Sequence, residues 1–399
     1  MGESQENIPS CGVLRREPIF NRELEMVATA LTFLSCDPQS PFTPAALEQG
    51  LRLLNEVTED PVFGTLPTVV DVPAQSLDAL LDLPWPLPTK ILRIKGGKTA
   101  IDDYRGSLAT LAQQGFEYIL DRGTGPGEME LKPKFWAVKG KTSASDTTGS
   151  PAHAPLWSTQ IDTREEFQGC VENPSTTWFS GRFWKRPEVK AQRSLPASQV
   201  GSLRLLAQLQ NPDVDVNDVE RIISCDTTLT YKLLKLLNSA FFVSPSRVES
   251  IHHGVNFFGL QRIKNWATVI VMNSVDFRPR EILPLGAYRA HLAETLAQAL
   301  KRPNAPQYYL VGLFSVLDAL FDCEMEQFIA PLNLHEEIVR ALLVHEGPYG
   351  ELLKWVISAE DGKPDWSDVS LPLQGLDLMR LQLEAQIWTN EFCHCLRGQ

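Results

Sequence analysis

Residues 226–238 read DTTLTYKLLKLLN, and this stretch decides the fold of the second half of the chain. Its apolar residues recur every three to four positions, which is the spacing of one face of an α-helix. Asp226 stands where an N-cap belongs, because a short side-chain oxygen there accepts hydrogen bonds from the first free backbone N–H groups. The pattern predicts a helix over 227–238 with a buried stripe of Leu229, Leu233, Leu236 and Leu237.

The same helical period continues toward the carboxyl terminus. An apolar stripe runs through Ile251, Val255 and Phe258 until Gly259 ends the pattern, as glycine commonly does at a helix terminus. Strand patterns are almost missing from this half, so residues 194–399 are predicted to form an all-α domain. Its further helices are expected around 263–271 and over 288–301, 308–323, 336–345 and 376–396.

Residues 1–193 show a different pattern, in which short β-branched or apolar runs alternate with amphipathic stretches. Such alternation predicts an α/β domain with a mostly parallel sheet. Residues 139–154 are rich in small polar residues and lack apolar periodicity, so they are predicted to be a disordered loop. The expected strands lie at 68–72, 90–94 and 117–120, and the expected helices at 45–55 and 104–114.

The composition places limits on function. The chain has 399 residues, of which 43% are hydrophobic and 22% charged, as in an ordinary globular protein of two domains. Its 49 acidic and 37 basic residues give a net charge of -12, which argues against binding to nucleic acid. The longest apolar stretch, 266–272, is too short for membrane insertion, and the first ten residues are polar and acidic. We therefore expect a cytoplasmic protein.

Motifs for catalysis or metal binding are incomplete. Gly97-Lys98-Thr99 ends like a phosphate-binding loop, but the glycine required at position 92 is a leucine. His345-Glu346 begins like a zinc-protease motif whose second histidine would fall at Tyr349. His252-His253 and Cys393-His394-Cys395 group metal-binding residue types, yet adjacent helical residues point in different directions. From these residues we expect no cofactor, no metal ion and no catalytic side chain.

A succession of short segments marks the start of the helical half. These are Leu195-Pro196, Asn211-Pro212, residues 222–226, Asn238-Ser239-Ala240-Phe241, Ser250-Ile251 and Gly259-Leu260. Through them, residues 194–345 resemble the HDOD domain, an output domain of bacterial signalling proteins. That domain is a helical relative of HD phosphohydrolases that lacks their catalytic residues, so the resemblance implies a helical domain without their activity.

The first half resembles the shortened, degenerate EAL domain that precedes HDOD in one family of such proteins. The resemblance rests on Glu17-Pro18-Ile19-Phe20 and on the aromatic-rich segment at 178–184. An intact EAL domain is a TIM-like barrel that hydrolyses cyclic di-GMP, with carboxylates that hold two cations. The resemblance therefore implies a barrel at 1–193 in which the state of these carboxylates decides the activity.

Most of the carboxylates that this resemblance requires are replaced. Ala30-Leu31-Thr32 stands where the motif has Glu-Ala-Leu, and an arginine replaces the glutamate of a later strand. Of a pair of aspartates only the first remains, and it is followed by a second arginine. Such arginines would repel the two cations. The altered positions are Ala30, Asp71 in place of an asparagine, Arg93, Asp121, Arg122, and Thr159 in place of a loop glutamate.

The resemblance favours a non-enzymatic signalling scaffold that presents its surfaces to other regulatory proteins. A second hypothesis is a sensor that binds a cyclic nucleotide without hydrolysing it, since an arginine such as Arg93 suits phosphate. A third is a metal-dependent phosphodiesterase that uses Asp121 and scattered histidines. The sequence leaves the partner, the pathway and the oligomeric state open.

Overall fold

The computed structural model describes residues 12–35, 43–57, 66–96, 103–121, 133–140, 155–187, 197–211, 213–239, 241–242, 247–275, 279–363, 373 and 376–397. The chain divides into two compact units. The barrel unit comprises Met1–Trp184 and Ser358–Glu384, and the helical unit comprises Lys185–Ile357 and Ala385–Gln399. No helix in the described part of the chain has both the length and the apolar character to cross a membrane.

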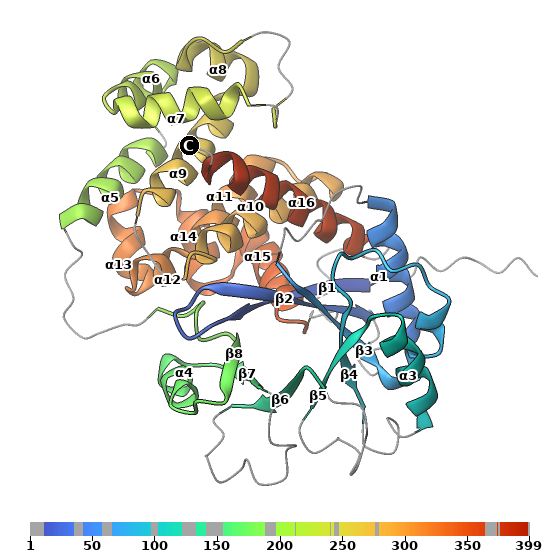
Figure 1. Ribbon diagram of the computed structural model, residues 1–399. Helices are drawn as coiled ribbons and strands as arrows, with labels where there is room; N and C mark the ends of the chain where they lie inside the picture. Colours follow the sequence, from blue (N-terminus) through green and yellow to red (C-terminus); the bar gives the residue numbers. More distant parts are fainter. Residues whose placement is uncertain are drawn as a thin grey trace, which may run out of the picture. The chain divides into compact units, whose positions relative to one another are not determined.

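The barrel unit is a closed barrel whose strands follow one another in sequence order (Figure 1). The first strand runs antiparallel to both of its neighbours, and all other neighbouring strands are parallel. The prediction of an α/β domain with a mostly parallel sheet is confirmed, and its TIM-like closure agrees with the resemblance. The strands are β1 Gly12–Phe20, β2 Met26–Ser35, β3 Thr68–Pro73, β4 Ile91–Lys95, β5 Glu117–Asp121, β6 Phe135–Lys139, β7 Leu156–Ile161 and β8 Thr176–Gly181.

Three α-helices follow strands of the barrel within the described residues, as Figure 1 shows. They are α1 Pro44–Val57, α3 Arg105–Gln113 and α4 Arg164–Val171. The connection from β3 to β4 instead contains the short 3₁₀ turns η1 Ala74–Ser76 and η2 Ala79–Leu81. Helix α4 begins at a capping box, in which the side chains of Thr163 and Glu166 each accept from the other residue's backbone N–H.

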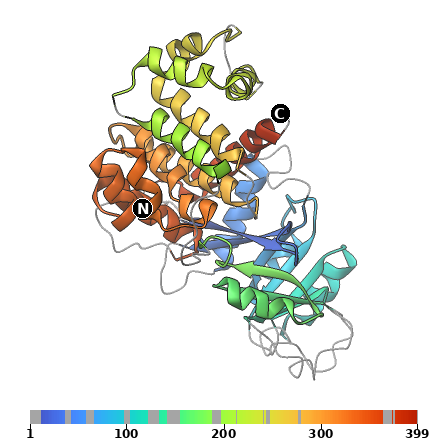
Figure 2. The same ribbon diagram turned by 90° about the vertical axis from the view of Figure 1, so that its left-hand side faces the viewer.

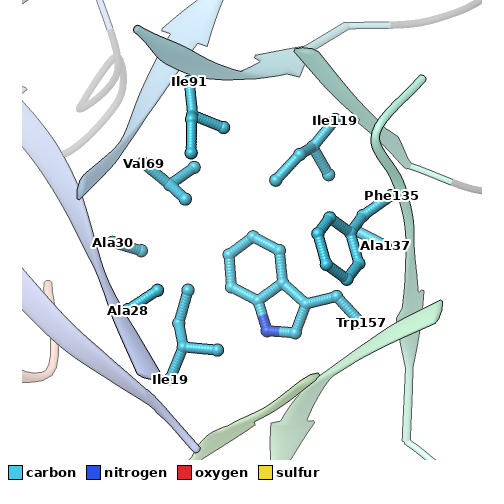
Figure 3. Packing of buried hydrophobic residues seen from close by; sticks show 9 residues of the cluster. All are labelled: Ile19, Ala28, Ala30, Val69, Ile91, Ile119, Phe135, Ala137 and Trp157. Carbon is cyan, nitrogen blue, oxygen red and sulfur yellow. The ribbon is translucent and has the colours of Figure 1, made fainter. Parts of the chain in front are cut away.

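Apolar side chains fill the middle of the barrel (Figure 3). The indole of Trp157 lies at the centre, and the small side chains of Ala28, Ala30 and Ala137 leave room for it. The indole N–H donates to the Ser180 hydroxyl at 3.0 Å, so burial leaves no polar atom of this ring unpaired. Ala30 is thus part of a packed core layer rather than of a polar site.

The two units differ from the predicted domains 1–193 and 194–399. The first boundary falls after Trp184, and residues 358–384 belong to the barrel unit. One reason is Gln382, in helix α16 (Leu378–Arg397), whose side-chain amide pairs with the backbone of Leu14 on β1. It accepts from the Leu14 N–H at 2.8 Å and donates to the Leu14 carbonyl at 3.0 Å. Because β1 pairs with β8 only at Phe20, this amide replaces a missing strand partner.

The helical unit confirms the prediction of an all-α domain, and both views show it as helices (Figures 1 and 2). The Asp226 carboxylate caps its helix as expected by accepting from the N–H groups of Thr228 and Leu229. Gly259, at a φ of 89°, separates two helices as expected. The helices before α16 are α5 Ala197–Gln210, α6 Val216–Ser224, α7 Thr227–Leu237, α8 Ile251–Phe258, α9 Leu260–Asn273, α10 Ile282–Ala299, α11 Ala305–Phe314, α12 Leu317–Phe321, α13 Met325–Ile329, α14 Glu336–Val344 and α15 Gly347–Glu360.

Two further predictions need correction or lie beyond the described residues. The helix predicted over 308–323 is divided into α11 and α12 at Ser315, whose hydroxyl donates to the Gly312 carbonyl and accepts from Arg289. Of the predicted loop 139–154, Lys139 is instead the last residue of β6, because it pairs in register with Thr159 of β7. Residues 141–154 lie outside the described residues.

Candidate functional site at the carboxyl end of the barrel

A charged layer lies above the apolar core of the barrel, toward the carboxyl ends of its parallel strands. Side chains alternate between the two faces of a strand, so a residue two positions beyond a core residue faces the same interior. This places Asp71 above Val69, Arg93 above Ile91, and Asp121 above Ile119. TIM barrels carry their active sites at this end, so this layer is the candidate functional site.

Arg93 is the central cation of this layer. It is 6% exposed, and its Nε and Nη2 both donate to Oδ1 of Asp121, at 3.2 and 3.0 Å. Its guanidinium carbon lies 4.5 Å from the centre of the Trp157 ring, a cation–π contact. Burial alone would lower the pKa of Arg93, but the nearby carboxylates of Asp71, Asp121 and Glu17 outweigh this and raise it. Arg93 therefore stays charged in the layer.

Asp71 lies on the neighbouring strand, directly beside Arg93 in register. It is 5% exposed, and its Oδ2 accepts a 2.9 Å hydrogen bond from the Thr32 hydroxyl. Its Oδ1 has no hydrogen-bond partner among the described residues. A buried carboxylate with one short hydrogen bond needs a nearby positive charge, and Arg93 supplies it.

Lys95 adds a second cation at the end of β4. Its Nζ lies 3.5 Å from Oδ2 of Asp121, so Arg93 and Lys95 contact different oxygens of one carboxylate. Burial lowers the pKa of Lys95, and the charge of Arg93 acts in the same direction, while Asp71 and Asp121 oppose them. Arg15 completes the group by pairing with Glu17 at 3.0 Å.

Among the described residues, the positive and negative side chains of this layer balance. The three carboxylates of Glu17, Asp71 and Asp121 face three cations, which are Arg15, Arg93 and Lys95. Two divalent cations need an excess of carboxylate charge, which such a layer does not offer. Among the described residues, no three or more His, Cys, Asp or Glu side chains gather closely enough to hold a metal ion. The described residues of this layer therefore do not fit a pair of divalent cations.

The structure brings together only some of the residues predicted from the sequence. Asp71, Arg93 and Asp121 form one charged network. Ala30 lies in the apolar core, and Thr159 is buried with its hydroxyl donating to the Val138 carbonyl at 3.1 Å. Arg122 lies outside the described residues.

Sequence reasoning missed five members of the site. These are Arg15, Glu17, Thr32, Lys95 and Trp157. A signal for the first four was available, because each lies two positions from a core or site residue on its own strand and so faces the same side. Trp157 was not identifiable in this way, since nothing in a strand pattern tells which large side chain occupies a barrel's centre.

Comparison with known proteins identifies the helical unit. The family model of the HDOD domain matches residues 195–327. Two curated proteins are 26% identical to the chain. The "Uncharacterized protein YuxH" of Bacillus subtilis aligns over 96% of this chain and 98% of its own length, and the cyclic di-GMP phosphodiesterase CdgJ of Vibrio cholerae over 94% and 92%.

Among solved structures, a protein of Marinobacter aquaeolei assigned to signal transduction is 14% identical, with a TM-score of 0.38. The match covers 99% of this chain and 96% of that one. The expected HDOD domain is confirmed, while the resemblance of the barrel to an EAL domain stays a prediction. The chain thus carries an HDOD domain at residues 195–327 and is similar over most of its length to a protein named a cyclic di-GMP phosphodiesterase.

Proposed function

We propose that this chain is a non-enzymatic signalling protein, in which a barrel that has lost its hydrolase site and an HDOD domain present surfaces to other regulatory proteins. The observation that carries the proposal is the Arg93 guanidinium, buried beside Asp71 and hydrogen-bonded to Asp121. Together with Lys95, Arg93 balances the charge of the two carboxylates that could hold a catalytic cation. Ala30 and Thr159 add no carboxylate to replace them.

The repulsion between a divalent cation and Arg93 supports the proposed loss of the hydrolase site. At a separation of 4 Å and an effective dielectric constant near 20, two unit charges interact with roughly 4 kcal/mol. A divalent cation beside Arg93 would face about twice that repulsion, and Lys95 would add to it. Hydrolysis of a phosphodiester by metal-activated water requires the opposite arrangement, in which carboxylates outnumber cations around the metal.

The competing function is hydrolysis, because the related protein CdgJ is named a cyclic di-GMP phosphodiesterase. At 26% identity that name does not carry over to this chain, and the balanced charge layer favours loss of the activity. A role in binding without turnover is also less favoured, since Arg93 is only 6% exposed and already donates two hydrogen bonds to Asp121.

Isothermal titration of the full-length chain tests the proposal. We expect no saturable binding when Mn²⁺ is added to the wild type. Weak, saturable binding should appear in Arg93→Gln, in which the central cation is lost while Asp71 and Asp121 remain. Saturable binding of Mn²⁺ by the wild type that is lost in Asp121→Asn would contradict the proposal. Binding of cyclic di-GMP that is lost in Arg93→Gln would instead favour a sensor.

The scaffold role has its own test. Full-length chain captured from its native cells should retain the same regulatory proteins whether or not it carries Asp121→Asn, because a scaffold uses its surface and not the barrel interior. Loss of those proteins in Asp121→Asn would indicate that their binding requires an intact charged layer in the barrel, which would contradict the scaffold role.

A further inference from the structure

The helical unit contains a cavity of about 270 Å³ that is separate from the charged layer of the barrel. Helices α8, α9, α10, α11 and α16 contribute residues to its wall. The volume is slightly below the range of about 300 Å³ and above that is typical of sites for drug-sized ligands. A cavity of this size suits one nucleoside-sized molecule.

Aromatic rings form two sides of this cavity. On one side, Trp266 packs against Phe242 with ring centres 4.3 Å apart and against Phe258 at 5.2 Å. On another, the ring of His291 stacks at 4.1 Å on Trp388, which in turn stacks on Phe392 at 4.7 Å. Such flat, apolar walls favour a planar ligand, because aromatic rings stack on a heterocyclic base whatever its substituents.

Two residues that line the cavity each have a buried polar atom with no hydrogen-bond partner among the described residues. One is the hydroxyl of Tyr309, a residue that is only 2% exposed. The other is Oε1 of Glu294, whose side chain is 12% exposed. Buried polar groups almost always have a partner, so these two atoms point to a bound molecule that supplies one.

Three other polar side chains on the cavity wall indicate which hydrogen-bonding groups a bound molecule needs. Asn265 already donates to the Pro306 carbonyl, and the Thr295 hydroxyl donates to the His291 carbonyl. Arg262 lies at 4.0 Å from Oε1 of Glu294 with about half of its side chain exposed. The cavity therefore presents an acceptor that lacks a donor within the described part of the chain, a hydroxyl, and a half-exposed guanidinium.

We infer that this cavity binds a guanine base. The Watson–Crick edge of guanine carries two adjacent N–H donors, which match the carboxylate of Glu294, whereas the same edge of adenine would direct an acceptor at it. The other edge of guanine offers the acceptors O6 and N7, the pair that arginine recognises best. The aromatic side chains of the cavity would stack on the guanine ring. This inference concerns the helical unit and is independent of the function proposed for the barrel.

Titration calorimetry of the full-length chain with guanosine tests the inference. We expect saturable binding that weakens about tenfold in Tyr309→Phe, which removes one hydrogen bond and keeps the ring. Glu294→Gln should weaken it at least as much, and adenosine should bind at least tenfold more weakly than guanosine. The matched control is Tyr308→Phe. Tyr308 is equally buried on the same helix but packs on Tyr349, away from the cavity wall, so its change should leave guanosine affinity within twofold.

Titration with cyclic di-GMP distinguishes two sources of the base. Affinity lost in Tyr309→Phe would assign a base of the dinucleotide to this cavity, and guanosine binding without cyclic di-GMP binding would assign a mononucleoside. The inference is overturned if guanosine at millimolar concentration gives no saturable heat. Equal affinity in the wild type, Tyr309→Phe and Glu294→Gln, or equal affinity for adenosine, would overturn it as well.

Discussion

Arg93 is surrounded by carboxylates and an aromatic face: Asp121 accepts its hydrogen bonds, Asp71 lies beside it in register, Glu17 contributes charge, and Trp157 lies beneath it. The substitution of a cation at this position could be recognised from the sequence. Its surroundings could not, because a single strand pattern does not tell which residues of other strands reach the same layer. Alternation along the strand could place Lys95 and Glu17 on the inner face, but only barrel closure brings them to Asp121 and Arg93.

Removing the charge of Arg93 should destabilise the barrel unit. Arg93→Met keeps much of the side-chain length but leaves Asp71 buried without its cation, and breaking a buried pair in this way typically costs about 3–5 kcal/mol. Urea unfolding followed by circular dichroism measures the loss. The matched control is Arg52→Met, which removes an exposed pair with Glu48 on α1 and should change stability by less than about 0.5 kcal/mol. Equal effects of the two substitutions would show that the network is not structural.

His291 makes the stability of the helical unit depend on pH. Burial lowers its pKa from 6.5 to about 4, and Glu294, Tyr309 and Arg262 are the titratable groups that share its cavity. Above pH 6.5 the ring is neutral in both states. Between pH 6.5 and 4 the unfolded chain takes up a proton that the folded ring refuses, so the free energy of unfolding falls, by at most about 3 kcal/mol.

The variant His291→Phe should lose this part of the pH dependence while its ring still stacks on Trp388. Urea midpoints measured from pH 7 to pH 4.5 give the comparison. The same change at the exposed His252 should leave the wild-type slope in place. A slope in His291→Phe that equals the wild-type slope would show that the buried ring does not control it.

Local patterns predicted the helices α7 and α8 closely, because caps and apolar stripes are local properties of the sequence. The break between α11 and α12 was missed, since the residues there are apolar on all sides and give no amphipathic period. The assignment of the first turns of α16 to the barrel unit was missed for another reason. The apolar period of α16 predicts a helix but does not tell which unit these turns contact.

A substitution of Gln382 tests whether the first turns of α16 belong to the barrel unit. Gln382→Leu should destabilise the barrel unit by about 2 kcal/mol or more, because it leaves the buried N–H and carbonyl of Leu14 unpaired. Hydrogen exchange at Leu14 should become faster. Gln386→Leu is the matched control, as Gln386 is also buried on α16 but donates to Asn390 within the helix. Unchanged exchange at Leu14 in Gln382→Leu would contradict the role of the amide.

At the scale of the whole molecule, the sequence indicated a barrel followed by a helical domain, but the chain does not pass from one unit to the other only once. It returns to the barrel unit at Ser358 and leaves it again after Glu384. Helices α15 and α16 each contribute residues to both units. A return of this kind depends on tertiary contacts and leaves no mark in composition or charge.

Turnover of cyclic di-GMP by the purified full-length chain with Mg²⁺ or Mn²⁺ tests the proposal that the barrel is not a hydrolase. We predict no product above the protein-free control at either metal, because the carboxylates at the mouth of the barrel are balanced by cations. Metal-dependent product formation that disappears in Asp121→Ala would contradict the claim.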